Sequence, residues 1–248
     1  MSKNLENQIE QLIVDKVAVL NRPDLFRKPI IGFSSAKDNR YSELKEIIGD
    51  WHLTPTELLP DAESVISYFV PFTELVVAEP KTVNDGSPVW GEAYAVINPY
   101  FDVVNKAVIQ YLAGLGYSAS AVQATHTYDP KDMQSMWSHR SAGAIAGLGI
   151  FGANRMLITE KGSGGRFCSV LTSAVLNKAQ NPAKNRCLYV TNDACGLCFK
   201  ICPVNALAPK SFNKFACQDE CNKNRKKDKH DADTCGKCIS VCPVAYID

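Results

Sequence analysis

The sequence predicts an α+β protein with an appended cysteine-rich segment. Apolar residues recur at helical spacing in residues 3–20, and short runs rich in β-branched and aromatic residues alternate with helical patterns as far as residue 180. Such alternation favours a mixed core of helices packed on a sheet. Beyond about residue 181, Asn, Lys, Pro and Cys dominate. We therefore expect two domains, residues 1–182 and 183–248.

Periodicity and residue type predict the elements of the first domain. Pro99 falls inside a long helical pattern and predicts a kink or a new helix start there. Residues 222–233 are polar and charged, which is typical of a solvated loop. In chain order we expect a helix at 3–20, a strand at 29–36, a helix at 41–48, a strand at 64–70, a helix that stops at 114–116, a strand at 118–123, a small-residue helix from 138, a glycine-punctuated loop leading to a strand before 159, and a strand at 167–176.

Composition excludes several classes of function. The 248 residues are 46% hydrophobic and carry a formal net charge of +1, so the overall field predicts neither a nucleic-acid partner nor an anionic membrane. The first 20 residues lack the basic and apolar regions of a signal peptide. No run of about 18 apolar residues occurs, so no membrane span is expected. We expect a cytoplasmic protein.

The ten cysteines are concentrated in one part of the chain. Residues 1–167 contain none, and nine lie between Cys187 and Cys242. The cytosol is reducing, so this distribution does not indicate a disulfide framework. It indicates a metal-binding segment. Cys168 stands apart in an expected strand, where we interpret it as a small buried apolar residue.

Two stretches repeat the pattern C-x2-C-x3-C-P, "CGLCFKICP" and "CGKCISVCP". This run is typical of ferredoxins with two iron–sulfur clusters, in which the cysteine before proline binds the other cluster. Proline suits the first turn of the helix that follows, where its missing N–H is not needed. Two C-x2-C pairs could instead bind one zinc ion. Zinc, however, does not explain the third cysteine and the proline of each run.

The usual first cysteine of each run is absent, and Asn192 and Ala232 hold its places. Each 4Fe–4S cluster therefore needs one more thiolate. Cys221 is an alternative to Cys217 that the sequence leaves open. We assign Cys187, Cys195, Cys198 and Cys242 to one cluster, and Cys202, Cys217, Cys235 and Cys238 to the other. Two clusters of low potential are typical of an anaerobic host.

The stretch "AGLGIFGANRMLIT" precedes "CGLCFKICPVNAL" and "CGKCISVCPV". Together these motifs resemble the epoxyqueuosine reductase family, which is related to the reductive dehalogenases. "LPDAESVISYFVPF" is also similar to that family's first core strand. The resemblance covers roughly residues 55–248.

The resemblance implies a nitroreductase-like α+β domain that holds a corrinoid, followed by a ferredoxin-like module that feeds it electrons. Cobalamin is then the expected cofactor, with FMN as the alternative. The partners implied are an electron donor of the ferredoxin or flavodoxin type and a small-molecule or protein-bound substrate. Gly147, Gly149, Gly152 and His139 are the candidate cofactor-binding residues. The glycines could equally form a tight helix-to-strand turn, and His139 could cap a helix or face solvent.

Other side chains near the expected pocket have two interpretations each. Arg140 could bind a phosphate or carboxylate, or form a surface ion pair. Tyr94 and Tyr100 could act as acids or belong to the core. His126 is a further candidate.

The sequence departs from the family pattern at the catalytic acid. Alignment of "YAVINPYFDVV" with the family's "RGRDY" places Asn98 and Pro99 at the Arg and Asp positions, and proline cannot donate a proton. Asp102 is a weak substitute, and the helical-repeat tail of the tRNA enzymes is missing. We expect a divergent redox protein, possessing either oxidoreductase activity or a plain electron-transfer role. Epoxyqueuosine reduction on tRNA and a flavin-dependent reductase are the remaining alternatives.

Overall fold

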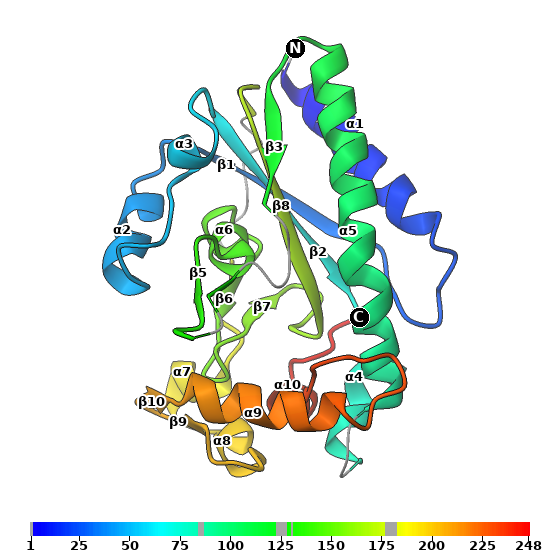
Figure 1. The fold of residues 1–248 in the computed structure, drawn as a ribbon, viewed down its shortest axis with the longest axis vertical. Helices are drawn as coiled ribbons and strands as arrows, with labels where there is room; N and C mark the ends of the chain where they lie inside the picture. Colours follow the sequence, from blue (N-terminus) through cyan, green and yellow to red (C-terminus); the bar gives the residue numbers. More distant parts are fainter. Residues whose placement is uncertain (1, 84–86, 123–127, 130, 177–182) are drawn as a thin grey trace.

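The computed structural model describes residues 2–83, 87–122, 128, 129, 131–176 and 183–248. Its centre is an antiparallel sheet of four strands in the order β1-β2-β8-β3 (Figure 1). The two middle strands pair over eight residues, from Ser64 opposite Thr172 to Pro71 opposite Gly165. This sheet and its helices confirm the mixed α/β core. The strands are β1 (Ile30–Ser35), β2 (Ser64–Pro71), β8 (Gly165–Thr172) and β3 (Ala119–Ala121).

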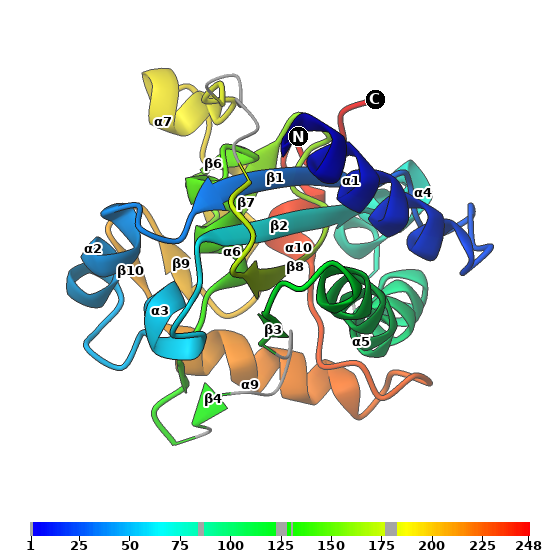
Figure 2. The ribbon, with the colours of Figure 1, turned by 90° about the horizontal axis from the view of Figure 1, so that it is seen from above.

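Helices α1 (Ser2–Ala18) and α5 (Pro88–Gly114) pack side by side against one face of the sheet (Figure 2). Alternate residues of β2 point to this face, because successive strand residues face opposite sides. Tyr68 contacts Phe101 edge to face, with ring centroids 5.6 Å apart. Cys168 is fully buried here, as its interpretation as a core residue predicts.

The other face of the sheet holds α6 (His139–Ile145) and the hairpin of β6 (Gly149–Phe151) and β7 (Leu157–Thr159). Phe69 and Phe167 stack here with centroids 4.3 Å apart. Helices α2 (Arg40–Ile47) and α3 (Pro55–Leu58) lie beyond α6 (Figure 1). The remaining elements of this part are α4 (Glu74–Ala78), η1 (Glu79–Lys81), β4 (Tyr128–Asp129) and β5 (Gln134–Ser135).

Residues 183–248, here called the cysteine module, gather at one end of the molecule (Figure 1). Its last residues return to the sheet, where Ser163 and Gly164 both donate backbone N–H groups to the carbonyl of Ala245. Arg27 donates to the carbonyl of Ile247 at 2.7 Å. The module consists of α7 (Leu188–Asn192), α8 (Leu197–Lys200), β9 (Leu207–Ala208), β10 (Ser211–Phe212), α9 (Lys214–Arg225) and α10 (Lys237–Ser240).

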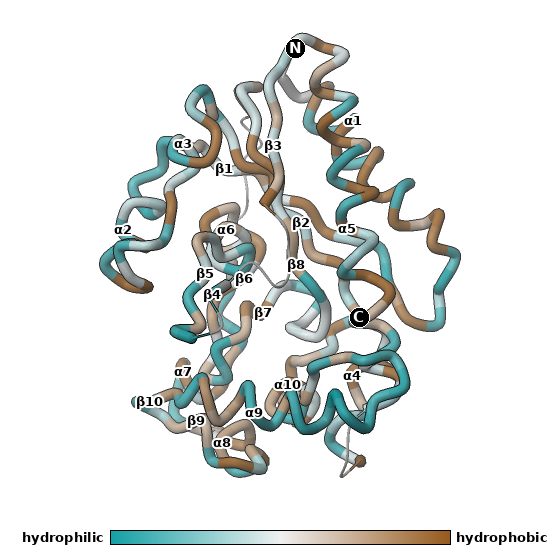
Figure 3. The backbone as a smooth tube through the Cα atoms, viewed as in Figure 1, coloured by the Kyte–Doolittle hydropathy of each residue, from teal (hydrophilic) through white to brown (hydrophobic). Residues whose placement is uncertain are grey.

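Three expectations about local structure are wrong. No new helix starts at Pro99, because α5 continues through it and the buried Ile97 and Phe101 hold the helix on the sheet from either side; the alternative of a kink stays a prediction. The glycine-punctuated loop contains strand β6, which pairs with β7. The charged run at 222–233 begins inside α9, which continues to Arg225 and carries apolar residues among hydrophilic ones (Figure 3).

The expected domain boundary borders residues 177–182, which lie outside the described residues, as does His126. Within the described parts of the chain, none of the helices is both long and apolar enough to cross a bilayer.

The C-terminal segment packs against Gly162, and this contact predicts that a substitution there lowers stability. This glycine has φ +92°, and a Cβ there would collide with the carbonyl of Ala245. We expect Gly162→Ala to lower the free energy of unfolding by about 2 kcal/mol, from strain and lost contact. Gly114→Ala is the control, because a Cβ at Gly114 meets nothing within 4 Å; it should raise stability by about 0.5 kcal/mol. Urea unfolding measures both, and equal effects would contradict the prediction.

Candidate metal centre and adjoining pocket

The two C-G-x-C runs fold alike. Gly196 and Gly236 each precede a short helix with positive φ, +133° and +71°, which L side chains rarely adopt. The second cysteine of each run lies on that helix, α8 or α10. The third lies just after the helix and before proline. The repeat in sequence is therefore a repeat in structure, with the cysteines of each run presented in the same order.

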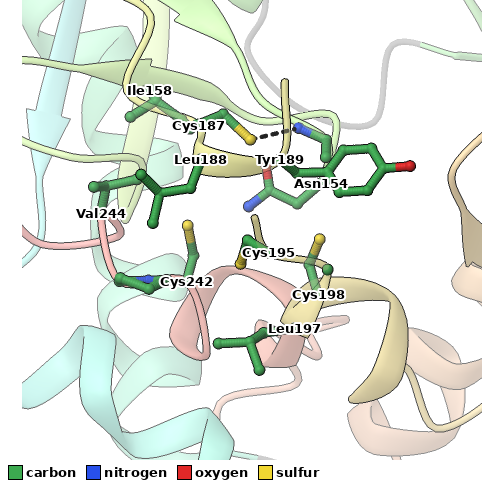
Figure 4. Close-up of a pocket in the computed structure, with 13 residues that line it drawn as sticks. Asn154, Ile158, Cys187, Leu188, Tyr189, Cys195, Leu197, Cys198, Cys242 and Val244 are labelled. Carbon is green, nitrogen blue, oxygen red and sulfur yellow. Dashed lines mark hydrogen bonds between the residues drawn. The ribbon is translucent and has the colours of Figure 1, made fainter. Parts of the chain in front are cut away.

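Four predicted ligands line one pocket, here called the four-cysteine pocket (Figure 4). Cys195 and Cys198 come from the first run, Cys242 from the second, and Cys187 precedes α7. The pocket holds about 390 Å³ of empty space, counting its open mouth. The backbone N–H of Ala153 donates to Cys187 Sγ at 3.4 Å. The structure thus brings the first predicted set together around a shared space.

These thiols cannot all carry charge in the absence of a cation. Burial, followed in importance by the neighbouring Cys242, Cys187 and Cys195, raises the pKa of Cys198 to about 11. Burial likewise raises the pKa of Cys242. A metal or cluster would supply the missing positive charge and displace the protons.

The second predicted set also gathers in one place. Burial raises the pKa of Cys238 to about 12, with further contributions from Cys235, Cys217, Cys198 and Cys202. Cys238 therefore neighbours members of both sets, which makes the two sets adjacent. The sulfur of Cys202 accepts the backbone N–H of Ala206 at 3.2 Å.

The choice between Cys217 and Cys221 stays open. The two lie one turn apart on α9, and the Cys221 thiol donates a hydrogen bond to Cys217. This bond lowers the pKa of Cys217 and raises that of Cys221. Both thiols interact with Cys235.

Among the described residues, no three His, Cys, Asp or Glu side chains lie close enough to hold a single metal ion.

A larger cavity, here called the open pocket, adjoins the four-cysteine pocket. It encloses about 1480 Å³, counting the space at its mouth, and its walls come from α2, α6, the β6–β7 turn and α7. Ala153 and Tyr189 line both cavities. A ligand in the open pocket would therefore be separated from the cysteine sulfurs by little more than these two residues.

Three arginines line the open pocket. Arg40 is paired with Asp38 at 2.7 Å. Arg140 donates to the carbonyl of Arg155 at 3.0 Å and to Met156 Sδ at 3.3 Å. The surface ion pair considered for Arg140 is not formed among the described residues. Its guanidinium, together with Arg155, makes this wall suited to an anionic group.

The candidate cofactor residues divide between the two interpretations. Gly152 lines the open pocket. Gly147 forms the turn after α6, and a Cβ at Gly149 would collide with the Ile158 carbonyl in the β6–β7 hairpin. His139 lies at the start of α6, where its Nδ1 is 2.7 Å from Ser169 Oγ; it is not among the described residues that line either pocket.

Asn98, Pro99 and Asp102, which concern the departure from the family's catalytic-acid motif, lie on α5. Asn98 Oδ1 accepts from Arg166 Nε at 2.9 Å, and Asp102 is exposed. The Arg166 guanidinium also lies 4.7 Å above the ring of Tyr94. Burial raises the pKa of Tyr94 to about 12, so its hydroxyl keeps its proton at neutral pH. Tyr100 instead donates to the carbonyl of Lys16, as a structural residue.

Two residues were missed from sequence. Asn154 donates to the carbonyl of Cys238 at 3.3 Å and accepts from the backbone of Met156. Its side chain thereby joins the β6–β7 turn to the cysteine module. The glycine-rich motif contains Asn154, but nothing in its spacing marks that role. Arg166 likewise opens β8 without a signal in the sequence.

Solved structures of several reductases have a similar fold. An epoxyqueuosine reductase solved with an epoxyqueuosine-modified stem loop of tRNA-Tyr has a TM-score of 0.61 at 18% identity, covering 99% of this chain and 66% of that one. The Streptococcus thermophilus epoxyqueuosine reductase has a TM-score of 0.56 at 17% identity over 95% of this chain and 66% of that one. A catabolic reductive dehalogenase in complex with 3-bromo-4-hydroxybenzoic acid has a TM-score of 0.59 at 16% identity over 88% of this chain and 30% of its own.

These comparisons confirm the expected likeness at the level of the fold. The chain spans 66% of the length of the epoxyqueuosine reductases, at identities that a divergent relative would show. No model of a protein family matches the sequence, and no curated protein matches it. One neighbour was solved with a tRNA stem loop, so the fold gives no support to the expectation that nucleic acid is not a partner.

The pKa shifts predict an order of thiol reactivity in metal-free protein. A thiolate is the nucleophile, so a lowered pKa populates it at lower pH. Cys217 should therefore be alkylated by iodoacetamide at lower pH than Cys198 or Cys238, whose pKa values are raised. Peptide mass spectrometry after brief labelling between pH 6 and 10 measures this order. In guanidinium chloride the differences should vanish, and earlier labelling of Cys198 in the folded protein would contradict the prediction.

Proposed function

We propose that this protein is an iron–sulfur reductase in which two 4Fe–4S clusters in the cysteine module pass electrons to a cofactor in the open pocket. The observation that supports this proposal most directly is the position of the four-cysteine pocket. Four thiols predicted as one ligand set surround it, and Ala153 and Tyr189 separate it from the open pocket. A short path favours electron transfer between the two.

The residues present fit two clusters. Cys187, Cys195, Cys198 and Cys242 would hold the first. Cys202, Cys235 and Cys238, with Cys217 or Cys221, would hold the second. Backbone N–H groups already donate to Cys187 and Cys202. Such bonds to cluster sulfurs, together with burial, set the reduction potential.

The open pocket fits a large planar cofactor, and we assign it a corrinoid, with FMN as the alternative. Without the space at its mouth the cavity measures about 680 Å³, which lies within the range of small-molecule and cofactor sites, about 300–1000 Å³. Gly152 lets the backbone of the β6–β7 turn form part of its wall. A bound corrinoid would supply the reductive chemistry at its metal.

This chain's own residues would bind and orient that group. Arg140 and Arg155 would bind anionic groups on the cofactor or substrate, because both residues line the cavity. Asn154 holds the β6–β7 turn against the module through Cys238 and so fixes the distance between cluster and cofactor.

There are two alternative functions. A plain electron-transfer protein would use the module and leave the open pocket empty. Reduction of epoxyqueuosine on tRNA is favoured by the neighbour solved with a tRNA stem loop. Against it, Asn98 and Pro99 occupy the catalytic positions, and Asn98 is already engaged by Arg166.

Iron content tests the clusters and the assignment of ligands. We expect about eight iron atoms per chain after anaerobic reconstitution with iron and sulfide, since each cluster holds four. Cys198→Ala should reduce the content by about half, because it removes a ligand of one cluster. Cys168→Ala is the control, since this fully buried cysteine lies in the core apart from both sets.

The same measurement of iron content decides whether Cys217 or Cys221, both on α9, is the cluster ligand. Cys217→Ala should lower iron content, whereas Cys221→Ala should leave it unchanged if Cys217 is the ligand. Zinc in place of iron in anaerobically purified wild-type protein would overturn the proposal.

Cofactor binding tests the open pocket. Cobalamin added to the reconstituted protein should bind with a base-off absorbance spectrum, and FMN should bind more weakly. Ala144→Phe places a ring in the cavity wall, because Ala144 lines the pocket; we expect at least about tenfold weaker binding from steric exclusion. Ala113→Phe, on the exposed side of α5, is the control. Binding of neither cofactor would favour the plain electron-transfer protein.

A further inference from the structure

One stretch of the cysteine module has no acidic residue. Residues 194–218 contain Lys200, Lys210 and Lys214 and no Asp or Glu, although the whole chain has nearly equal numbers of basic and acidic residues. Lys200 and Lys210 are exposed, and neither forms an ion pair within the described residues. The surface here therefore carries uncompensated positive charge.

The same stretch exposes large apolar side chains. Phe212 and Phe215 are 45% and 49% exposed, Leu197 is 42% exposed and Val204 is 36% exposed. The local backbone is well fixed, because β9 and β10 pair and the Asn213 side chain caps α9 by accepting the N–H of Ala216. Apolar side chains held rigidly in water and surrounded by like charges are typical of protein-binding surfaces.

This stretch of the chain includes two cysteines of the second set, Cys202 and Cys217. Val204, Phe212 and Phe215 all lie between Cys202 and Cys217 in the chain. Phe215 is two residues before Cys217 at the start of α9, and Val204 is two residues after Cys202. A protein that docks here would come within a few residues of both thiols.

We propose that the basic-apolar face, made of Leu197, Lys200, Val204, Lys210, Phe212 and Phe215, is the docking site for a protein electron donor whose redox centre is surrounded by acidic residues. The proposal rests on the proposed function, because it requires a cluster beneath the face. The step moves one electron and forms no bond: the donor is oxidised by one electron and the cluster is reduced by one. Opposite charges would steer the encounter, and the apolar side chains would hold the complex.

The more basic run at 222–233 suits this role less well. Its charges are partly neutralised, by the Arg225–Asp231 pair and by Lys223 and Glu220 at 3.5 Å. Its far end packs on α5, where His230 lies 4.0 Å from Glu92. The run therefore provides a matched control on the same module.

The test compares two charge reversals of equal size. Lys200→Glu/Lys210→Glu changes the docking face, and Lys226→Glu/Lys229→Glu changes exposed lysines of the other run. Anaerobic stopped-flow absorbance measures cluster reduction by a fully reduced bacterial flavodoxin at low ionic strength. We expect the first variant to lower the bimolecular rate constant by about tenfold or more, and the second by less than about twofold. Added salt should reduce the difference by screening.

Dithionite, a small reductant, should reduce both variants at the wild-type rate, which shows that their clusters are intact. Equal losses in the two variants would mean that net charge alone matters and would overturn the proposal. An unchanged rate in the first variant would also overturn it. If that variant instead lost affinity for a tRNA stem loop at an unchanged flavodoxin rate, the face would bind nucleic acid and the proposal would be wrong.

Failure of the proposed function would be visible separately. Wild-type protein without iron would show that no cluster exists, whatever the face does. Calorimetric titration with oxidised flavodoxin then tests docking on its own. Binding to the wild type that is lost in Lys200→Glu/Lys210→Glu would support the face, and absence of binding to the wild type would overturn it.

Discussion

The electrostatics of crowded, partly buried thiols dominate the structure of the module. Cys198 and Cys238 have strongly raised pKa values because burial and neighbouring cysteines disfavour their charge. A protein gains nothing for stability by gathering sulfur in this way unless a cationic group compensates it. Gly196 and Gly236, which have positive φ, and the prolines that follow the third cysteine of each run position the thiols close together. The rest of the module is arranged around them.

The β6–β7 turn connects this sulfur-rich region with the sheet. Ala153 donates to Cys187, Asn154 donates to the carbonyl of Cys238, and Gly152 lines the open pocket. A single turn therefore contacts both sets of cysteines and the cavity. Its position explains why a glycine-rich motif and a cysteine repeat far apart in the sequence belong to one site.

Much of the fold and half of the site were accessible from sequence. Strong periodicity predicts the sheet strands and α1. The spacing of the cysteines predicts that Cys187 and Cys242, 55 positions apart, belong to the same ligand set. The helix start expected at Pro99 is wrong, because burial of its neighbours outweighs the local propensity of proline to end a helix. Asn154 and Arg166 were missed because a single polar residue that bridges two segments has no periodicity. His139 was placed by proximity in sequence, whereas its ring turns toward Ser169 on the sheet.

The anchoring of the last residues has a consequence for cooperativity. Arg27 contacts Ile247, 220 positions away, and Ala245 lies three residues from Cys242. A cysteine of the four-cysteine pocket is thus close in the chain to residues that are bonded to the end of the sheet. Opening of either part would release the other, so the module and the sheet should behave as a single unfolding unit, and damage at this pocket would loosen the whole molecule.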